Sequence, residues 1–402
     1  MTSFQEMTFS ELLSDAEVFV DGDWVESKDQ DPNGDVRLIQ LADIGDGFYI
    51  DKSSRFLNSE TAKRLKCTYL EEGDILVARM PDPLGRACIF PKSDMPCVTV
   101  VDVCIIRPNQ NKVDNRWLMH TINSPVMRQR INEYVTGTTR QRISRGNFSK
   151  LKISVPPLAE QRRIASILDQ ADELRQKRQQ AIEKLEQLLQ ATFIDMFGDP
   201  VSNPIGWDVK KLENLTTKIG SGSTPKGGDS AYKDEGISLV RSLNIYDGQF
   251  SYKNLAFIDQ DQADKLKNVI LQANDVLLNI TGASVARCCL VPNGILPARV
   301  NQHVSILRVK DNLIPEFLEA LLISKPMKLH LLKISGAGAT REALTKLQLQ
   351  ELEIIVPPLD IQNEFLLKLE SIKCLIDLNS KQLNELDKLF ISSQNQAFSG
   401  TL

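Results

Sequence analysis

The sequence predicts two tandem copies of a mixed α/β (α+β) domain, each followed by a long α-helix. Three observations support this fold class. The 402 residues nearly repeat themselves 201 positions along the chain, and each copy begins with about 155 residues of short strand-like and helix-like runs. Each copy then ends in a long segment with helical composition, whose apolar residues follow a heptad pattern.

The repeat extends through the framework of both copies. Leu38, Ile44, Asp46 and Gly47 recur as Leu239, Ile245, Asp247 and Gly248, and Val155-Pro156-Pro157-Leu158 recurs as Val356-Pro357-Pro358-Leu359. We expect this register to hold without a gap. A single repeat of this length indicates a duplicated domain, because solenoid repeats run to roughly 20–50 residues.

Short elements of both kinds are expected within each copy. Runs rich in β-branched residues and bounded by Gly, Pro and Asp predict strands, with counterparts 201 residues later. These runs are Val36–Leu41, Asp74–Arg79, Val98–Arg107 and Leu151–Val155. Between them we expect helices at Ser59–Lys66 and Asn115–Asn123, repeated at Gln260–Lys267 and Glu316–Ser324. The combination favours a mixed sheet.

The segment Leu158–Phe197 contains no Gly or Pro and is dense in strong helix formers. At about 1.5 Å per residue, one helix of this length spans roughly 60 Å. In the second copy a heptad seam joins Phe365, Leu369, Ile372, Ile376, Asn379, Leu383, Leu386 and Phe390. The first copy carries the same seam at Ile164, Leu168, Ala171, Arg175, Arg178, Ile182, Leu185 and Leu189.

We therefore expect the two helices to pair as an antiparallel coiled coil, with the two domains at opposite ends of one rod. Arg178 and Asn379 would then lie near the middle, where a polar core residue can set the register. The alternative is that these two side chains only face solvent. The predicted segments are residues 1–157, 158–197, 198–358 and 359–398: domain, helix, domain and helix.

The net charge of −4 hides an uneven distribution of charge. Residues 1–35 carry ten acidic side chains and one basic one, whereas residues 128–152 carry seven basic side chains and one acidic one. Local fields of this kind, more than the total charge, decide whether a phosphate backbone is attracted.

Composition excludes some classes of protein. With 42% apolar and 25% charged residues, the composition is typical of a globular protein. No apolar run approaches the length of a membrane-spanning helix. The first residues do not resemble a secretion signal, so we expect a cytoplasmic protein that does not enter membranes. The seven cysteines lack CxxC spacing, which predicts reduced, mostly buried thiols and no zinc site.

No catalytic motif is complete. The segment from Gly222 to Gly227 opens like a phosphate-binding loop, but Gly228 and Asp229 stand where Lys and Ser or Thr are required, so a flexible loop is expected. The three histidines are isolated in the sequence, and core or surface roles account for them. We expect no covalent chemistry and no metal or other cofactor in this chain.

Loops at equivalent positions of the two copies carry side chains that can reach base edges or phosphates. The predicted DNA-contacting residues are Arg79, Arg86, Arg140, Arg142, Arg145, Lys226, Asn279, Thr281, Arg287 and Arg341. Arg107 and Arg308 lie inside apolar strands instead, and for them we favour pairing with a local carboxylate.

The run from Pro156 to Ile164, Pro-Pro-Leu-Ala-Glu-Gln-Arg-Arg-Ile, resembles the DNA-specificity subunit of type I restriction-modification systems. In that family a strand ends in Pro-Pro-Leu, Glu-Gln-x-x-Ile opens a long helix, and the unit occurs twice. The second copy keeps Gln362 but has Ile361 and Phe365 in place of Glu160 and Ile164. Further similar stretches are Gly73-Asp74-Ile75-Leu76, residues 219–225 and Phe197-Gly198-Asp199-Pro200, so the resemblance covers essentially the whole chain.

The resemblance implies a division of labour. Each domain would be a target-recognition domain that reads one half of a bipartite, asymmetric site in double-stranded DNA, and the helices would set the unread spacer. Two modification subunits carrying S-adenosylmethionine would dock on the helices and domains, and restriction subunits can add ATP- and Mg-dependent translocation and cleavage. The alternative function is a helical assembly scaffold that binds protein partners and no DNA.

Overall fold

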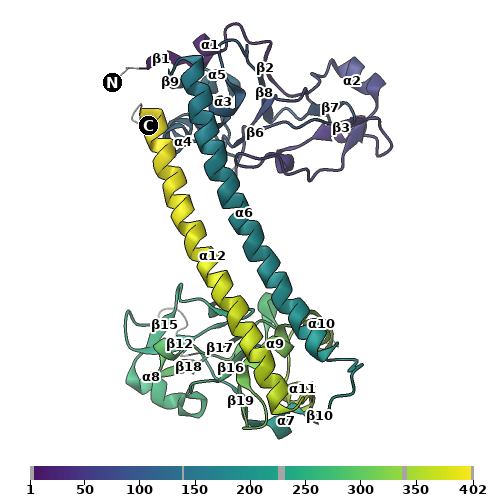
Figure 1. The fold of residues 1–402 in the computed structure, drawn as a ribbon, viewed down its shortest axis with the longest axis vertical. Helices are drawn as coiled ribbons and strands as arrows, with labels where there is room; N and C mark the ends of the chain where they lie inside the picture. Colours follow the sequence, from purple (N-terminus) through teal and green to yellow (C-terminus); the bar gives the residue numbers. More distant parts are fainter. Residues whose placement is uncertain (1–3, 138–139, 225–230, 337–341, 400–402) are drawn as a thin grey trace. The chain divides into compact units, whose positions relative to one another are not determined.

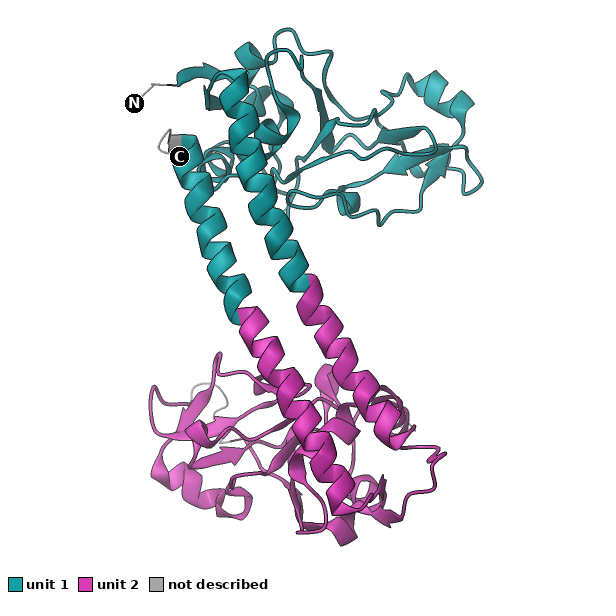
Figure 2. Ribbon diagram, viewed as in Figure 1, with its two compact units in different colours: residues 1–179, 381–402 teal, residues 180–380 magenta. Residues whose placement is uncertain are grey.

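The computed structural model describes residues 4–137, 140–224, 231–336 and 342–399 (Figure 1). Contacts divide the chain into two compact units. Unit 1 contains residues 1–179 and 381–402, and unit 2 contains residues 180–380 (Figure 2). Each unit therefore combines one globular part with a portion of both long helices, a division that cuts across the predicted helical segments.

The two units contain the same elements in nearly the same order. Those of unit 1 are β1 (Gln5–Thr8), α1 (Phe9–Leu12), β2 (Val18–Asp21), β3 (Val36–Ile39), β4 (Phe56–Leu57), α2 (Ser59–Leu65), β5 (Ile75–Ala78), β6 (Ala87–Ile89), β7 (Cys97–Thr99), β8 (Val103–Arg107), α3 (Asn115–Ile122), α4 (Pro125–Glu133), α5 (Arg145–Phe148) and β9 (Lys152–Val155). Those of unit 2 are β10 (Val209–Lys211), α7 (Leu212–Leu215), β11 (Thr216–Ser221), β12 (Ile237–Val240), β13 (Ile245–Tyr246), β14 (Gln249–Phe250), β15 (Ala256–Ile258), α8 (Gln260–Lys265), β16 (Val276–Asn279), β17 (Cys288–Leu290), β18 (Ala298–Val300), β19 (Val304–Val309), α9 (Pro315–Ile323), α10 (Lys325–Gly336), α11 (Lys346–Glu351) and β20 (Glu353–Ile355).

Each unit is built on a four-stranded antiparallel sheet, in the order β2-β8-β5-β6 in unit 1 and β11-β19-β16-β17 in unit 2. A three-stranded sheet accompanies it, β4-β3-β7 or β15-β12-β18, with one parallel and one antiparallel pairing. The predicted fold class, two tandem domains with mixed sheets, is confirmed.

The four-stranded sheet of unit 1 separates two apolar cores because alternate residues of a strand face opposite sides. On β5, Ile75 and Val77 pack with the helices, whereas Leu76 and Ala78 face the second core. The sheet of unit 2 repeats this arrangement. Strands buried on both faces lose the polar alternation of a surface strand, so they appear in the sequence as continuous apolar runs.

Two details of the predicted register are wrong. The run Val98–Arg107 is not one strand, because residues 100–102 turn the chain from β7 in the three-stranded sheet to β8 in the four-stranded sheet. The repeat also slips by one residue. The helix α3 begins at Asn115 and its counterpart α9 at Pro315, because the loop after Arg308 is one residue shorter than the loop after Arg107.

The arginines inside the apolar strands pair with local carboxylates, which confirms our interpretation of them. Arg107 contacts both carboxylate oxygens of buried Asp74 at 2.7 and 2.9 Å, and Arg308 contacts those of buried Asp275 at 2.7 and 2.8 Å. Such bidentate contacts compensate each buried carboxylate for its lost hydration.

The long helices follow the predicted bounds closely. The first, α6, spans Leu158–Phe197 and the second, α12, spans Leu359–Ser399. Every residue of both predicted seams is buried or partly buried, whereas their neighbours are mostly exposed. In unit 1 the early part of α6 contacts the late part of α12 through Arg175 and Asp387, at 2.6 Å. In unit 2 the end of α6 contacts the start of α12 through Phe193 and Phe365, so the helices pair antiparallel.

A buried glutamine joins each long helix to its globular part. Gln161 accepts a hydrogen bond from the backbone N–H of Asp114 at 2.9 Å and donates to the carbonyls of Lys112 and Pro156, at 3.1 and 2.9 Å. Gln362 makes the equivalent three bonds in unit 2. Both side chains are at most 1% exposed. Each amide therefore ties the first turn of the long helix to the loop before α3 or α9.

The cysteines are free thiols, and only Cys374 is exposed. In the described part of the chain, no helix has the length and apolar character needed to cross a membrane.

We expect Gln161→Ala to lower the free energy of unfolding of unit 1 by about 2–3 kcal/mol, because one backbone N–H and two carbonyls lose their partner in a buried place. Hydrogen exchange should increase first at the start of α6 and in residues 112–118. The control is Gln170→Ala, at an exposed position of the same helix. Equal effects of the two substitutions would contradict the anchoring role.

Candidate nucleic-acid interface

In each unit, the predicted contact loops meet at one end of the four-stranded sheet. We call this region the loop edge. In unit 1 it comprises residues 21–23, 79–86, 100–102, 136–137 and 140–145, and in unit 2 residues 221–224, 280–287, 301–303 and 342–345. Strands β2 and β5 end there and β8 and β6 begin there, as do their counterparts in unit 2. Antiparallel pairing thus collects segments that lie far apart in the sequence.

The two loop edges share one backbone scaffold. The N–H of Arg79 donates to the carbonyl of Asp102, and the carbonyl of Arg79 accepts from Ile143, at 2.9 and 3.1 Å. In unit 2 the N–H of Ile280 donates to His303 and its carbonyl accepts from Leu344, at 3.0 and 2.8 Å. The backbone is therefore repeated, while the side chains on it differ.

Arg79 is part of the scaffold of unit 1. Its side chain is only 3% exposed and donates to the carbonyls of Val101 and Ile143. Its Nε atom lies 3.3 Å from the carboxylate of Asp21. This burial does not support the predicted contact of Arg79 with DNA, because the guanidinium already contacts a carboxylate and two carbonyls inside the loop edge.

Arg86 is engaged in the same way. It is 8% exposed and donates to four backbone carbonyls, those of Ile44, Leu41, Met80 and Pro83, at 2.6–3.2 Å. Burial lowers the pKa of this arginine. Its donors hold together the loop between β5 and β6, so its burial does not support a direct contact with DNA either.

Of the three residues predicted to contact DNA from the equivalent loop of unit 2, one is buried and two are partly exposed. Asn279 is fully buried and donates to the Ser242 carbonyl at 2.9 Å, which makes it a scaffold residue. Thr281 and Arg287 are partly exposed. The guanidinium of Arg287 lies over the ring of Tyr246, 4.8 Å from its centre, so this arginine is oriented by a cation–π contact.

Three arginines of unit 1 lie where a phosphate could reach them. Arg140 and Arg142 are exposed, and within the described residues neither side chain has a carboxylate partner. Arg145 is partly exposed, donates to the Phe19 carbonyl at 2.6 Å and lies 3.7 Å from Asp21. The predicted contacts at Lys226 and Arg341 lie outside the described residues, as do residues 225–227 of the loop that begins at Gly222.

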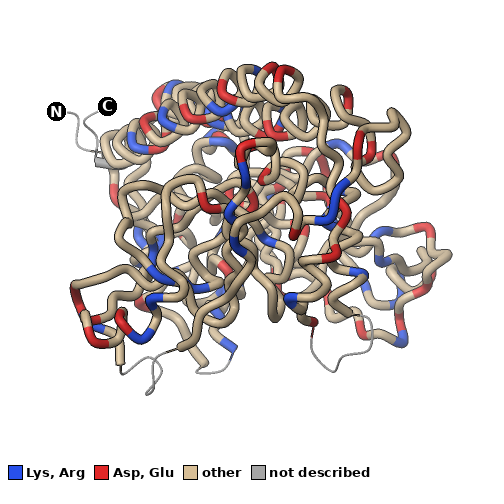
Figure 3. The backbone as a smooth tube through the Cα atoms, turned by 90° about the horizontal axis from the view of Figure 1, so that it is seen from below, with Lys and Arg blue, Asp and Glu red and all other residues tan. Residues whose placement is uncertain are grey.

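The acidic amino-terminal segment lies against the basic segment that follows α3. Asp21 faces Arg145, and Glu6 contacts Lys152 at 3.2 Å. Arg128 pairs with Asp46 from a third segment. Figure 3 shows basic and acidic residues interspersed over the backbone. Two ion pairs therefore connect the two charge blocks of the sequence, and Arg140 and Arg142 are exposed cations at the loop edge.

A polar network at the loop edge of unit 2 was missed by the sequence analysis. The imidazole of His303 bonds to Thr281 through Nδ1 and to the amide of Gln302 through Nε2, and Gln302 also bonds to Thr224. Gln302 is exposed. Comparison of the two copies could have identified this network, because His303 replaces Asp102 at an otherwise repeated backbone position.

The two register residues lie at partly buried positions of the helix seam. The amide of Asn379 donates to the carbonyl of Leu375 within its own helix at 2.7 Å. The role of Arg178 and Asn379 in setting the register therefore stays a prediction.

The described residues contain no cluster of His, Cys, Asp or Glu that could hold a metal ion. Burial raises the pKa of Cys88, Cys104 and Cys289 to about 12, so these thiols are not activated nucleophiles. His120 bonds to Asp169 at 2.8 Å and serves to hold α6. The exposed groups at the loop edges include cations and amides, which can bind a ligand through charge and hydrogen bonds.

The comparisons agree with this geometry. A family model for the type I restriction modification DNA specificity domain matches residues 10–186 and again residues 204–388. The type I restriction enzyme MjaVIII specificity subunit of Methanocaldococcus jannaschii is 24% identical, with 100% of this chain and 96% of the relative covered. The EcoBI specificity subunit of Escherichia coli is 25% identical, over 75% of this chain and 68% of the relative.

Solved structures share the fold. A chain of a type I restriction-modification system has a TM-score of 0.61 at 19% identity and covers 100% of this chain and 99% of its own length. The specificity subunit of such a system from M. genitalium has a TM-score of 0.56 at 14% identity, over 99% and 97% of the two chains. With the family model matching most of the sequence in two copies, the chain belongs to the family of type I restriction-modification DNA specificity proteins.

Proposed function

We propose that this chain is the non-catalytic specificity subunit of a type I restriction-modification complex, and that each loop edge reads one half of a bipartite DNA site. The observation that carries the proposal is a repeated backbone scaffold on which the two units place different side chains. Arg79, Asp102 and Arg142 of unit 1 correspond to Ile280, His303 and Ala343 of unit 2. Two units that differ in this way would read two different half-sites, and the whole site would be asymmetric.

In this proposal the exposed side chains of the loop edges contact DNA, and the buried ones hold the loops in position. Exposed Arg140 and Arg142 would meet phosphates or guanine edges in unit 1, with Arg145 beside them. In unit 2, Thr281, Arg287 and exposed Gln302 would take this place, together with Lys226 and Arg341. Arg79, Arg86 and Asn279 would act indirectly by holding the loops in shape.

The antiparallel helices would set the spacer between the half-sites, with Arg178 and Asn379 fixing their register. Two modification subunits would dock on the helices and recognition domains and supply S-adenosylmethionine and the adenine-methylating site. Restriction subunits would add ATP- and Mg-dependent cleavage. Such a complex acts on chromosomal DNA, which agrees with a cytoplasmic location.

Sequencing of methylated adenines in host DNA, with and without the intact gene, tests the proposal. We expect a bipartite motif that disappears when the gene is deleted. Replacing Gln302 by Ala should then change one half of the motif only, which assigns that half to unit 2. A methylome that does not change on deletion, while the protein and its partners are expressed, would favour the assembly scaffold.

Arg140→Ala should weaken DNA binding and flatten its salt dependence. If Arg140 neutralises one phosphate, the slope of log K against log salt falls by about 0.9. Binding of the purified complex to its own site at several salt concentrations measures the slope. Arg64→Ala is the control, since Arg64 is exposed on α2 and pairs with Asp29. An unchanged slope in Arg140→Ala would rule out the phosphate contact.

Removal of about seven residues, two helical turns, from both α6 and α12 should shorten the recognised spacer. The lost length is about 10 Å, or roughly three base pairs at 3.4 Å each. The methylome of the variant should therefore contain both original half-sites at a smaller separation. New half-site sequences at the old separation would refute the role of the helices as a ruler.

A further inference from the structure

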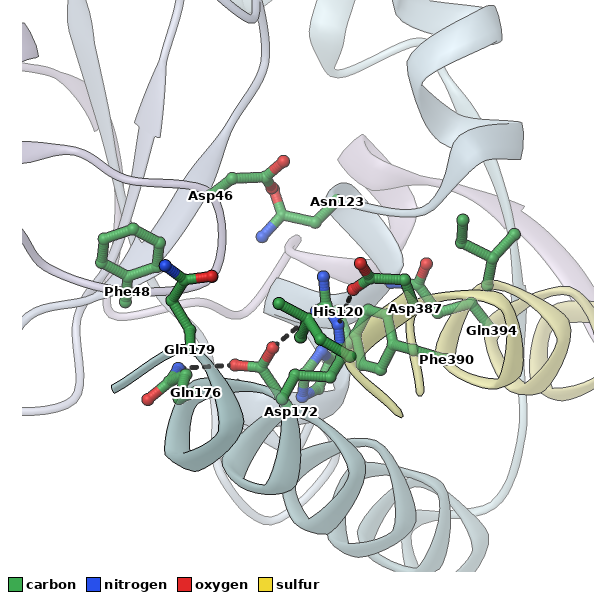
Figure 4. A pocket seen from close by; sticks show the side chains of 14 residues that line it. Asp46, Phe48, His120, Asn123, Asp172, Gln176, Gln179, Asp387, Phe390 and Gln394 are labelled. Atoms are coloured by element: carbon green, nitrogen blue, oxygen red, sulfur yellow. Dashed lines mark hydrogen bonds and ion pairs between the residues drawn. The ribbon is translucent and has the colours of Figure 1, made fainter. Parts of the chain in front are cut away.

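Unit 1 contains a cavity of about 480 Å³ that lies apart from the loop edge (Figure 4). Its walls are formed by α6, by the last turns of α12, by the end of α3 and by the loop that contains Phe48. The DNA-reading role proposed above makes no use of this cavity.

The amide of one largely buried residue faces the cavity. Gln394 of α12 is only 5% exposed, and among the described residues its side chain makes no hydrogen bond. Its Oε1 and Nε2 atoms are not among the buried side-chain atoms that lack a partner, so they are open to the cavity. A ligand that enters the cavity can therefore bond to this amide.

The lining of the cavity has more acidic than basic side chains, so it favours a positively charged ligand. Three carboxylates, those of Asp46, Asp172 and Asp387, accompany one guanidinium, that of Arg175. Arg175 contacts one oxygen of Asp387 at 2.6 Å and one of Asp172 at 2.8 Å. It also stacks on the ring of Phe390, 4.5 Å from its centre. Asp46 is paired with Arg128, so a negative charge is left over among these groups.

The exposed residues that line the cavity are both apolar and polar, since Phe48 and Ile391 lie there with Asp46, Gln176 and Gln179. Phe48 is 51% exposed and Ile391 is 50% exposed, and both line the cavity. Ile391 also borders a shallow groove with Val126, which is 44% exposed. A side chain with an apolar stem and a charged end fits a lining of this mixed character.

Unit 2 has different chemistry at the equivalent positions. Phe193 of α6 takes the place of Gln394, and its ring packs against Phe197, Phe317 and Phe365 with centres 5.1–5.8 Å apart. Ile376 replaces Arg175. The combination of amide and carboxylates is therefore particular to unit 1, although the helices themselves are repeated.

We propose that this cavity receives an arginine side chain of the modification subunit that docks on unit 1. Its guanidinium bonds to the carbonyl oxygen of Gln394 and to Asp387, and its methylene groups pack between Phe48 and Ile391. Arginine fits better than lysine, because a planar fork can bond to two acceptors at once. The inference rests on the proposed function, which supplies the partner.

The test is reconstitution of the full chain with the modification subunit of its own restriction-modification system. Gln394→Phe copies the residue of unit 2 and fills the cavity, and Ile391→Lys places a positive charge on its exposed rim. We expect each to weaken binding of one modification subunit at least tenfold, so that native mass spectrometry shows a complex with a single modification subunit. Gln382→Phe, the same change at an exposed position of α12 outside the cavity, should bind two.

The outcomes separate the two proposals. Wild-type protein that binds no modification subunit would contradict the proposed function itself. Wild-type affinity in both Gln394→Phe and Ile391→Lys would overturn the inference while leaving the function intact. Photocrosslinking from position 391 identifies the occupant. A crosslink to an arginine-containing segment of the modification subunit supports the inference, and a crosslink to a second copy of this chain or to a segment without arginine overturns it.

Discussion

The buried amides of Gln161 and Gln362 are the interaction on which the architecture of both units depends. Each amide satisfies three backbone groups from two chain segments, and it does so at the residue where a long helix leaves a globular part. The amide thus ties the first turn of each helix to the globular part of its own unit. Next to it, Ile164 and Leu168 in unit 1 and Phe365 and Leu369 in unit 2 pack into the same apolar cores.

The four-stranded sheet of each unit holds the loops of the loop edge in place. Strands buried on both faces tolerate little change, because each inward residue belongs to one of two packed cores. The loops that connect them at the loop edge can vary while their backbone hydrogen bonds are kept. Buried Arg79 and Arg86 hold this scaffold through hydrogen bonds to backbone carbonyls, whereas Arg140, Arg142 and Gln302 are exposed on it.

The duplication has not made the two units equivalent in their helices. An aromatic cluster around Phe193 closes the helix pair in unit 2, whereas unit 1 has Gln394 and Arg175 beside a cavity at the related positions. Packed rings leave no polar group open, whereas the amide of Gln394 can still bond to a ligand in the cavity. The duplication has therefore left different chemistry at related positions of the helices, just as the two loop edges carry different side chains.

The sequence by itself determined the duplication, the mixed sheets, the bounds of α6, the helix seam and the pairing of Arg107 and Arg308 with carboxylates. These features follow from local periodicity and from repeated residues, and both can be recognised in the sequence alone. Only the tertiary structure decided which arginines are buried, where the register slips, and that the acidic and basic segments meet. The physical reason is that burial and partner choice depend on contacts between segments far apart in the chain, and no local pattern encodes those contacts.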